Sequence, residues 1–173
     1  MPNWCFNRLR VYAHDGEESE KQLKKFIKEN VHLENDIDAL SFQGSAPRPK
    51  DLDITAGSRT EEEEAQAKIN RKKYGYEDWY EWSINEWGTK WDACSSYVDD
   101  EDDNEIYITF ETAWSPPLEW MRKASEKYPL LTFENNVEEE SDAFIGKPIA
   151  KSGNLCENIT DIRYPQEVGE NKH

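Results

Sequence analysis

Four of the chain's seven tryptophans lie within the nineteen residues from Tyr74 to Asp92. Indole rings are large and mostly apolar, so a segment this rich in them must pack against the rest of the chain or against a ligand. At about 100° per residue, a helix from Tyr76 to Trp87 gathers its apolar side chains on one arc. The arc contains Tyr76, Trp79, Tyr80, Ile84 and Trp87. We therefore expect a helix with a buried aromatic face, and Trp82 outside that face as a candidate for surface contacts.

The remaining patterns predict a single α+β domain, which suits a length of 173 residues. Period-two alternation predicts strands, and spacing of about 3.6 residues predicts helices. Strands are expected at 4–12, 89–97, 106–113 and 130–137, and helices at 17–30, 61–73, 76–87 and 116–128. Apart from the two helices at about 61–88, the order is strand, helix, strand, strand, helix, strand. This is the ferredoxin-like βαββαβ plan with an antiparallel sheet and a tryptophan-rich helical insertion.

Turn signals mark the ends of these elements. Gly88 is expected to end the aromatic helix, and Ser115 to cap the last helix, which would be entered through Pro116. A C-terminal hairpin extension is expected around 146–153. The domain would then cover 1–165, leaving 166–173 as a polar tail.

Acidic residues outnumber basic ones by 37 to 21, which gives a formal net charge of −16. Such a charge opposes general nucleic-acid binding and favours a partner with a basic surface. Two acidic runs, at 99–103 and 138–140, are the expected interaction surface, the first at the tip of a hairpin. Their residues are Asp99, Asp100, Glu101, Asp102, Asp103, Glu138, Glu139 and Glu140.

No cofactor and no metal are expected. Cys5, Cys94 and Cys156 are scattered, without the paired spacing of a zinc or iron–sulfur site. His14 and His32 accompany no nucleophile or phosphate-loop motif, so catalysis is not predicted. No apolar run reaches the roughly 20 residues of a membrane span, and no signal peptide precedes the first strand, so the host cytoplasm is the expected compartment.

In a second interpretation, the tryptophan-rich segment at 74–92 binds a ligand. Rigid rings offer large contact area at low entropic cost, and a basic pair on the first strand, Arg8 and Arg10, would complement them. The binding candidates are Trp79, Trp82, Trp87, Lys90, Trp91, Arg8 and Arg10. Burial of the rings against the sheet is the simpler alternative for the same pattern.

Several short motifs stand out in the sequence. They are Pro2-Asn3-Trp4-Cys5 with Asn7, Asp78-Trp79-Tyr80-x-Trp82, Trp87-Gly88-Thr89-Lys90-Trp91-Asp92 and Trp114-x-Pro116-Pro117. Together they resemble a family of small phage and plasmid proteins, the YubB type, to which Phe144-Ile145-Gly146 is a weaker match. The resemblance implies a ferredoxin-like domain in a protein of a mobile element. One position departs from the family pattern, because Glu86 stands where asparagine is expected and Asn85 lies one place earlier.

Two functions therefore remain open from the sequence. The first is a non-enzymatic acidic protein of a phage, prophage or plasmid that binds a host protein, in a counter-defence role. The second is a protein that binds or sequesters a small nucleotide-like ligand in the aromatic block. Neither the identity of a partner nor the oligomeric state follows from the sequence.

Overall fold

The computed structural model describes residues 1–34 and 36–162. Its strands form one sheet in the order β2-β3-β1-β4-β5-β8, with β6 also paired to β4 and β7 paired to β6. The strands are β1 Trp4–Ala13, β2 Cys94–Glu101, β3 Glu105–Ala113, β4 Leu131–Glu139, β5 Phe144–Gly146, β6 Ile149–Lys151, β7 Asn154–Cys156 and β8 Ile159–Asp161. The helices are α1 Glu17–Asn30, α2 Glu61–Tyr74, α3 Trp79–Glu86 and α4 Leu118–Lys127, with 3-10 turns η1 Phe42–Gly44 and η2 Lys50–Leu52.

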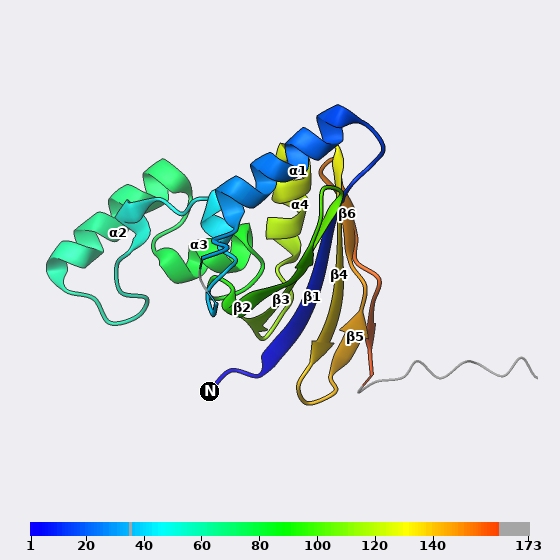
Figure 1. The fold of residues 1–173 in the computed structure, drawn as a ribbon. Coiled ribbons are helices and arrows are strands. Elements are labelled where there is room, and N and C mark those ends of the chain that lie inside the picture. The colour runs from blue at the N-terminus through cyan, green and yellow to red at the C-terminus, as the bar shows by residue number, and fades with distance from the viewer. Residues whose placement is uncertain (35, 163–173) are drawn as a thin grey trace, which may run out of the picture.

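The first four strands, with α1 and α4, make the ferredoxin-like domain that the sequence predicts. In the order β2-β3-β1-β4 every neighbouring pair is antiparallel, and α1 and α4 lie on one side of the sheet (Figure 1). Strand β1 is central, and its residues 4–12 pair with β3 while its residues 5–13 pair with β4. The predicted fold class is therefore confirmed.

Alternation along β1 determines which side chains enter the core. Cys5, Leu9 and Val11 are fully buried, whereas Arg8 on the opposite face is exposed. Helix α1 has the predicted bounds and buries Leu23 and Phe26. Because the apolar faces of β1, β3, β4, α1 and α4 converge, they form one hydrophobic core.

A small polar network crosses this core. The Asn7 amide on β1 donates to the Thr112 hydroxyl on β3 at 3.0 Å, and the Asn135 amide on β4 donates to the Asn7 carbonyl oxygen at 3.0 Å. All three residues are fully buried. The network connects the central strand to both neighbours, which fixes the register of three strands.

The predicted start of the second strand and the predicted cap of the last helix are wrong. The second strand begins at Cys94 instead of residue 89, because Thr89 belongs to a turn and its hydroxyl donates to the Ala113 carbonyl at 2.9 Å. Ser115 does not cap α4. Its hydroxyl donates to the Gly88 carbonyl at 2.6 Å, and α4 begins at Leu118 after Pro117.

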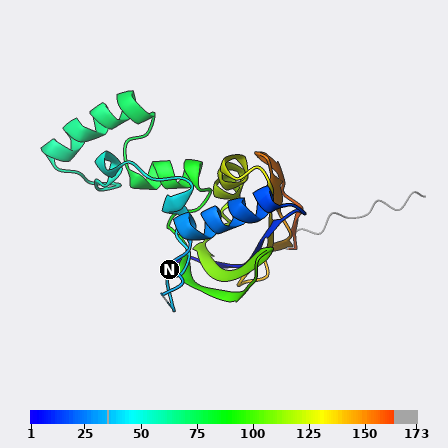
Figure 2. The same cartoon turned by 45° about the horizontal axis from the view of Figure 1, so that its top comes forward.

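The insertion consists of η2, α2, α3 and their connections. Helix α2 extends away from the sheet, and α3 lies between it and the domain (Figures 1 and 2). A capping box formed by Thr60 and Glu63 starts α2, and Gly75 ends it with φ at 81°, a left-handed conformation that glycine adopts without strain. The predicted helical insertion is therefore present.

The C-terminal extension contains a hairpin at 149–156, slightly later than the predicted 146–153. Strands β6 and β7 form it around Ser152 and Gly153, while β5 pairs with β4 and β8. The expected tail at 166–173 lies outside the described residues. No described helix is long and apolar enough to span a membrane.

Candidate functional site

Helix α3 places the tryptophan block differently from the prediction. The helix begins at Trp79 because the Asp78 carboxylate accepts a hydrogen bond from the Glu81 amide at 3.0 Å. It packs on α4 through the side that carries Trp82, which is only 7 % exposed and has its ring centroid 5.2 Å from that of Trp87. The expectation that Trp82 makes surface contacts is therefore wrong.

The buried side of α3 is rotated relative to the predicted arc. Tyr80 and Ile84, expected inside, are 38 % and 37 % exposed. Trp87 is buried as expected, and its indole N–H donates to the Ala46 carbonyl at 2.9 Å. Gly88 follows with φ at 85°, and a Cβ there would lie 3.2 Å from the Leu118 amide nitrogen, so the turn requires glycine.

A pocket of about 500 Å³ lies beside this block, and we call it the tryptophan pocket. Three of the four clustered tryptophans line it, together with residues of the loop between α1 and α2. Its lining residues are Gln43, Arg48, Asp53, Ile54, Thr55, Trp79, Trp87, Trp91 and Asp92. Its size falls within the range of about 300 to 1,000 Å³ that is usual for small-ligand sites. Of the four tryptophans predicted to form an aromatic pocket, Trp79, Trp87 and Trp91 line this one.

Arg48 is the cation of the tryptophan pocket, and its guanidinium is already engaged. It donates to the Asp53 carboxylate from Nε at 3.0 Å and Nη2 at 2.8 Å, and to the Ser83 hydroxyl at 3.2 Å. Its Cζ atom lies 5.4 Å from the centroid of a Trp87 ring. Arg48 therefore presents a flat, hydrogen-bonded surface next to the indole of Trp87.

Asp92 positions the chain at the edge of the pocket. Its carboxylate accepts hydrogen bonds from the Phe42 amide at 2.7 Å, the Ala93 amide at 2.8 Å and the Ser41 hydroxyl at 2.8 Å. Burial raises the pKa of Asp92, and the hydrogen bond from the Phe42 amide is the largest opposing influence. The carboxylate thus connects the η1 turn to the segment that carries Trp91.

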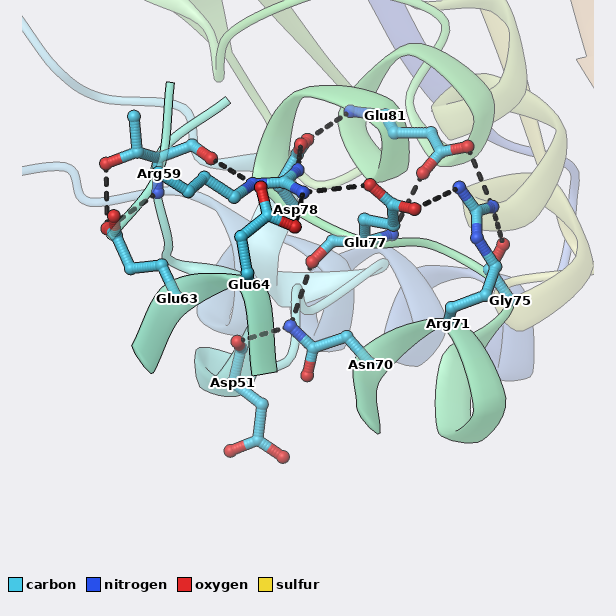
Figure 3. Close-up of polar contacts among 11 residues, drawn as sticks. Asp51, Arg59, Glu63, Glu64, Asn70, Arg71, Gly75, Glu77, Asp78 and Glu81 are labelled. Atoms are coloured by element: carbon cyan, nitrogen blue, oxygen red, sulfur yellow. Dashed lines mark hydrogen bonds and ion pairs between the residues drawn. The ribbon is translucent and has the colours of Figure 1, made fainter. Parts of the chain in front are cut away.

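A network of ion pairs and hydrogen bonds around Arg59 connects the Thr55 loop with the segment before α3 (Figure 3). Arg59 donates to the Thr55 carbonyl at 2.7 Å and to the carboxylates of Glu77 at 2.9 Å and Asp78 at 2.5 Å. The Thr55 amide and hydroxyl donate to the Glu63 carboxylate at 3.2 and 2.8 Å. Thr55, which lines the pocket, is therefore held by the first turn of α2 and, through Arg59, by the segment that precedes α3.

The other predicted binding residues do not enter the pocket. Arg8 and Arg10 lie on the outward face of β1, where Arg10 pairs with Glu105 and stacks over Tyr12. Lys90 lies beside Trp91 but is not among the lining residues. The prediction of a basic pair at the aromatic block therefore had the wrong residues, because the alternation of β1 turns both arginines away from the helices.

The two acidic runs do not form one surface. The prediction that the whole first run lies at the hairpin tip is wrong, because Asp99, Asp100 and Glu101 belong to β2. Asp102 and Asp103 lie in the β2–β3 turn, and all five residues are exposed. That hairpin adjoins Tyr12, which pairs with Glu105, whereas the second run adjoins Cys5, which pairs with Glu139. Since a strand rises about 3.3 Å per residue, these ends of β1 lie roughly 23 Å apart.

Glu139 is also not a surface residue. It is only 4 % exposed, and its carboxylate accepts hydrogen bonds from the Ser141 hydroxyl at 2.6 Å, the Ser141 amide at 2.9 Å and the Ala143 amide at 3.1 Å. These donors, led by the Ser141 hydroxyl, lower the pKa of Glu139 to about 2. Glu139 therefore stabilises the turn after β4, while Glu138 and Glu140 remain exposed.

Sequence reasoning missed most of the residues that complete the pocket. Gln43, Asp53, Ile54 and Thr55 belong to a segment that shows no regular pattern. One signal was available, because Arg48 stands out as a basic residue in an otherwise irregular loop. Nothing in the sequence connects that loop to the tryptophans, since the contact depends on the tertiary fold.

Comparisons with known proteins support the fold. Residues 90–170 match the family described as a ferredoxin-like domain in Api92-like protein. The crystal structure of protein Api92 from Yersinia pseudotuberculosis aligns with 93 % of this chain and 98 % of that chain, at 10 % identity and a TM-score of 0.53. At that identity the likeness shows the fold alone. No curated protein matches the sequence.

Proposed function

We propose that this protein binds a small planar ligand in the tryptophan pocket. The observation that supports this proposal is the convergence of Trp79, Trp87 and Trp91 with Arg48 around one pocket of about 500 Å³. Ligand sites are usually apolar hollows with a few oriented polar groups, and this pocket has both features. The side-chain oxygen of Gln43 accepts a hydrogen bond from the Arg48 backbone N–H at 2.8 Å, and its NH2 group adds a donor to the pocket.

The charges around the pocket favour an uncharged ring over a phosphate. One cation, Arg48, faces two carboxylates, Asp53 and Asp92. Arg48 already donates to Asp53 and Ser83, so a phosphate entering the pocket would meet carboxylates and a guanidinium that is not free. The nucleotide-like ligand expected from the sequence is therefore narrowed to an unphosphorylated heteroaromatic ring of nucleobase or nucleoside size.

The test is a titration of the protein with purine and pyrimidine nucleosides and with their 5′-monophosphates at matched ionic strength. Isothermal titration calorimetry measures the affinity, and tryptophan fluorescence follows the same titration. Nucleosides are expected to bind more tightly than the monophosphates, because the acidic edge of the pocket repels phosphate.

Trp79→Ala removes a pocket wall without opening the core, since Trp79 is half-buried and lies at the first turn of α3. Because stacking of a base on an aromatic ring contributes about 1 to 3 kcal/mol, affinity should fall roughly 5- to 150-fold. Trp114→Ala is the matched control, because Trp114 is an exposed tryptophan that does not line the pocket. Unchanged affinity in Trp79→Ala, or no binding of any nucleoside by the wild type, would contradict the proposal.

We also propose a second function, that the acidic run at 99–103, on the end of β2 and the β2–β3 turn, recruits a host protein with a basic surface. Five exposed carboxylates at 99–103 support it, and among the ion pairs of the described residues only Lys24 reaches this run, 3.9 Å from Asp103. On this proposal the protein is a non-enzymatic accessory factor of a phage or plasmid, as its resemblance to the YubB type implies, and acts in the host cytoplasm.

Affinity capture from host lysate tests this second proposal. Wild type is compared with a variant in which 99–103 are neutralised to the corresponding amides, and with a control in which exposed Glu138 and Glu140 are neutralised. Loss of one basic protein in the first variant alone supports the proposal. Capture that is independent of the hairpin charges contradicts it.

A further inference from the structure

Lys90 holds its ammonium group among aromatic rings. Its Nζ atom lies 4.6 Å from the ring centroid of Trp91, 5.0 Å from that of Trp114 and 5.8 Å from that of Tyr80. Among the described residues no hydrogen bond or ion pair joins Lys90 to a carboxylate, although the chain carries a net charge of −16. Three rings within about 6 Å of one cation make a cation–π box.

The box is assembled from three separate segments. Tyr80 lies on α3, Trp91 follows the turn after Gly88, and Trp114 lies between β3 and α4. Trp91 also packs near Trp4, with ring centroids 6.2 Å apart. These segments meet because α3 and the ferredoxin-like domain pack together, so the box is a product of the tertiary fold.

Trp114 is held in the box by a strained backbone. Its φ is 67°, a region that large side chains rarely adopt, and its amide donates to the Asn3 carbonyl at 2.8 Å. The indole is nevertheless 43 % exposed. A fold that strains its backbone to keep a large apolar ring at the surface is typical of a functional position.

We propose that Tyr80, Trp91 and Trp114 form an aromatic cage for a trimethylammonium group, and that Lys90 occupies this cage in the absence of such a ligand. Aromatic cages recognise methylated ammonium groups because these cations lose little hydration when they enter. The primary ammonium of Lys90 is compact and strongly hydrated, so it is the weaker occupant. Tyr80 and Trp114 are 38 % and 43 % exposed, so two of the three rings are accessible from solvent.

The cage is distinct from the tryptophan pocket. Only Trp91 belongs to both, while Tyr80, Lys90 and Trp114 do not line the pocket. Substitution of Trp114 therefore tests the cage, and substitution of Trp79 tests the pocket. The two proposals can fail independently of each other.

The probe is tetramethylammonium chloride, titrated against matched sodium chloride while the indole N–H resonances are recorded by NMR. Wild type is expected to show saturable shifts of Trp91 and Trp114. Lys90→Ala should bind about tenfold more tightly, because the competing occupant is gone. Lys90→Arg keeps a cation in the cage and should remain near wild type.

Trp114→Ala should abolish the saturable response in both the wild-type and the Lys90→Ala backgrounds, while Trp79→Ala should retain it. Circular dichroism establishes that each variant is folded. Two further arms, choline and free Nε-trimethyllysine, distinguish a small metabolite from a modified side chain as the source of the group. A response that survives Trp114→Ala, or one that appears only in Lys90→Ala, would overturn the proposal.

Discussion

The ferredoxin-like domain and the insertion are stabilised by different interactions. The domain buries large apolar side chains between its sheet and helices α1 and α4, whereas α2 buries only Ala67 and Asn70 and leaves Ile69 56 % exposed. Leu52 of η2 and Trp82 of α3 join that core, but the α2 part of the insertion depends on Arg59, whose side chain is 8 % exposed and pairs with the carboxylates of Glu64, Glu77 and Asp78. Apolar burial responds little to salt or acid, but ion pairs respond to both.

This difference matters because the tryptophan pocket takes its walls from both regions. Trp87 belongs to the hydrophobic core, while Thr55 and Trp79 belong to the insertion. One wall is therefore rigid, and the other depends on a polar network. A substitution that loosens the insertion should therefore lower ligand affinity more than one that lowers the stability of the whole domain to the same extent.

The largest expected effect is in the core. Phe133 is fully buried on β4, with ring centroids 5.4 Å from Phe26 and 6.3 Å from Trp120. Phe133→Ala removes these contacts and leaves a cavity, so the free energy of unfolding should fall by about 3 to 5 kcal/mol. Guanidinium denaturation followed by circular dichroism measures the change. A loss below about 1 kcal/mol would contradict the view that this cluster is the main source of stability.

A smaller and more local effect is expected in the insertion. Arg59→Met leaves the buried Asp78 carboxylate without its cation and should destabilise α2 and the Thr55 loop by about 2 kcal/mol. Hydrogen exchange should show faster exchange in 54–75 with unchanged protection in β1 and β4. Arg71→Met is the control, because Arg71 is 48 % exposed and its ion pairs are screened by solvent. If Arg59→Met and Arg71→Met accelerated hydrogen exchange equally, the buried ion pairs of Arg59 would stabilise the insertion no more than the exposed ones of Arg71.

Glu139 tests the comparison between the domain and the insertion, because it is a buried carboxylate within the ferredoxin-like domain. Its pKa of about 2 lies below the value of roughly 4.3 for an unfolded glutamate. Its stabilising contribution is therefore complete above pH 4.3 and is lost as the pH falls toward 2. The difference in urea midpoint between wild type and Glu139→Gln should shrink over that range. Glu138→Gln, which removes an exposed charge next to it, is the control, and a pH-independent difference for Glu139→Gln would exclude this role.

The smallest effect is expected at Ile69. Because this side chain is 56 % exposed on α2, Ile69→Ala removes little burial, and stability should change by less than about 0.5 kcal/mol. The same denaturation measurement as for Phe133→Ala provides the comparison. A loss near that of Phe133→Ala would show that α2 contributes an apolar contact of its own.

The sequence predicted those parts of the fold that apolar periodicity determines. The structure has α1 at the predicted bounds of about 17–30, and β1 was predicted to within one residue. The face of α3 was predicted incorrectly, because Trp79, Tyr80, Trp82 and Ile84 surround the helix and offer several apolar arcs. Packing on α4 selected the arc with Trp82, and no local pattern encodes that choice.

The candidate site was predictable only in part for a related reason. The density of tryptophans at 74–92 predicted an aromatic site, and three of these four tryptophans line the pocket. The cation Arg48 and the positioning carboxylate Asp92 come from segments about 40 residues apart, and their approach depends on the fold of the irregular loop. The acidic runs were visible in the sequence, but their separation required the register of β1 with β3 and β4.

The central place of β1 has a consequence for how the chain folds. This first strand pairs with β3 and β4, so its contacts join residues that are roughly 90 to 135 positions apart. Closing loops of that size costs entropy before any stabilising contact forms, and domains dominated by distant pairings fold slowly. Residues 4–13 must therefore wait for most of the domain to be synthesised, and until then their alternating apolar face is open to capture by chaperones.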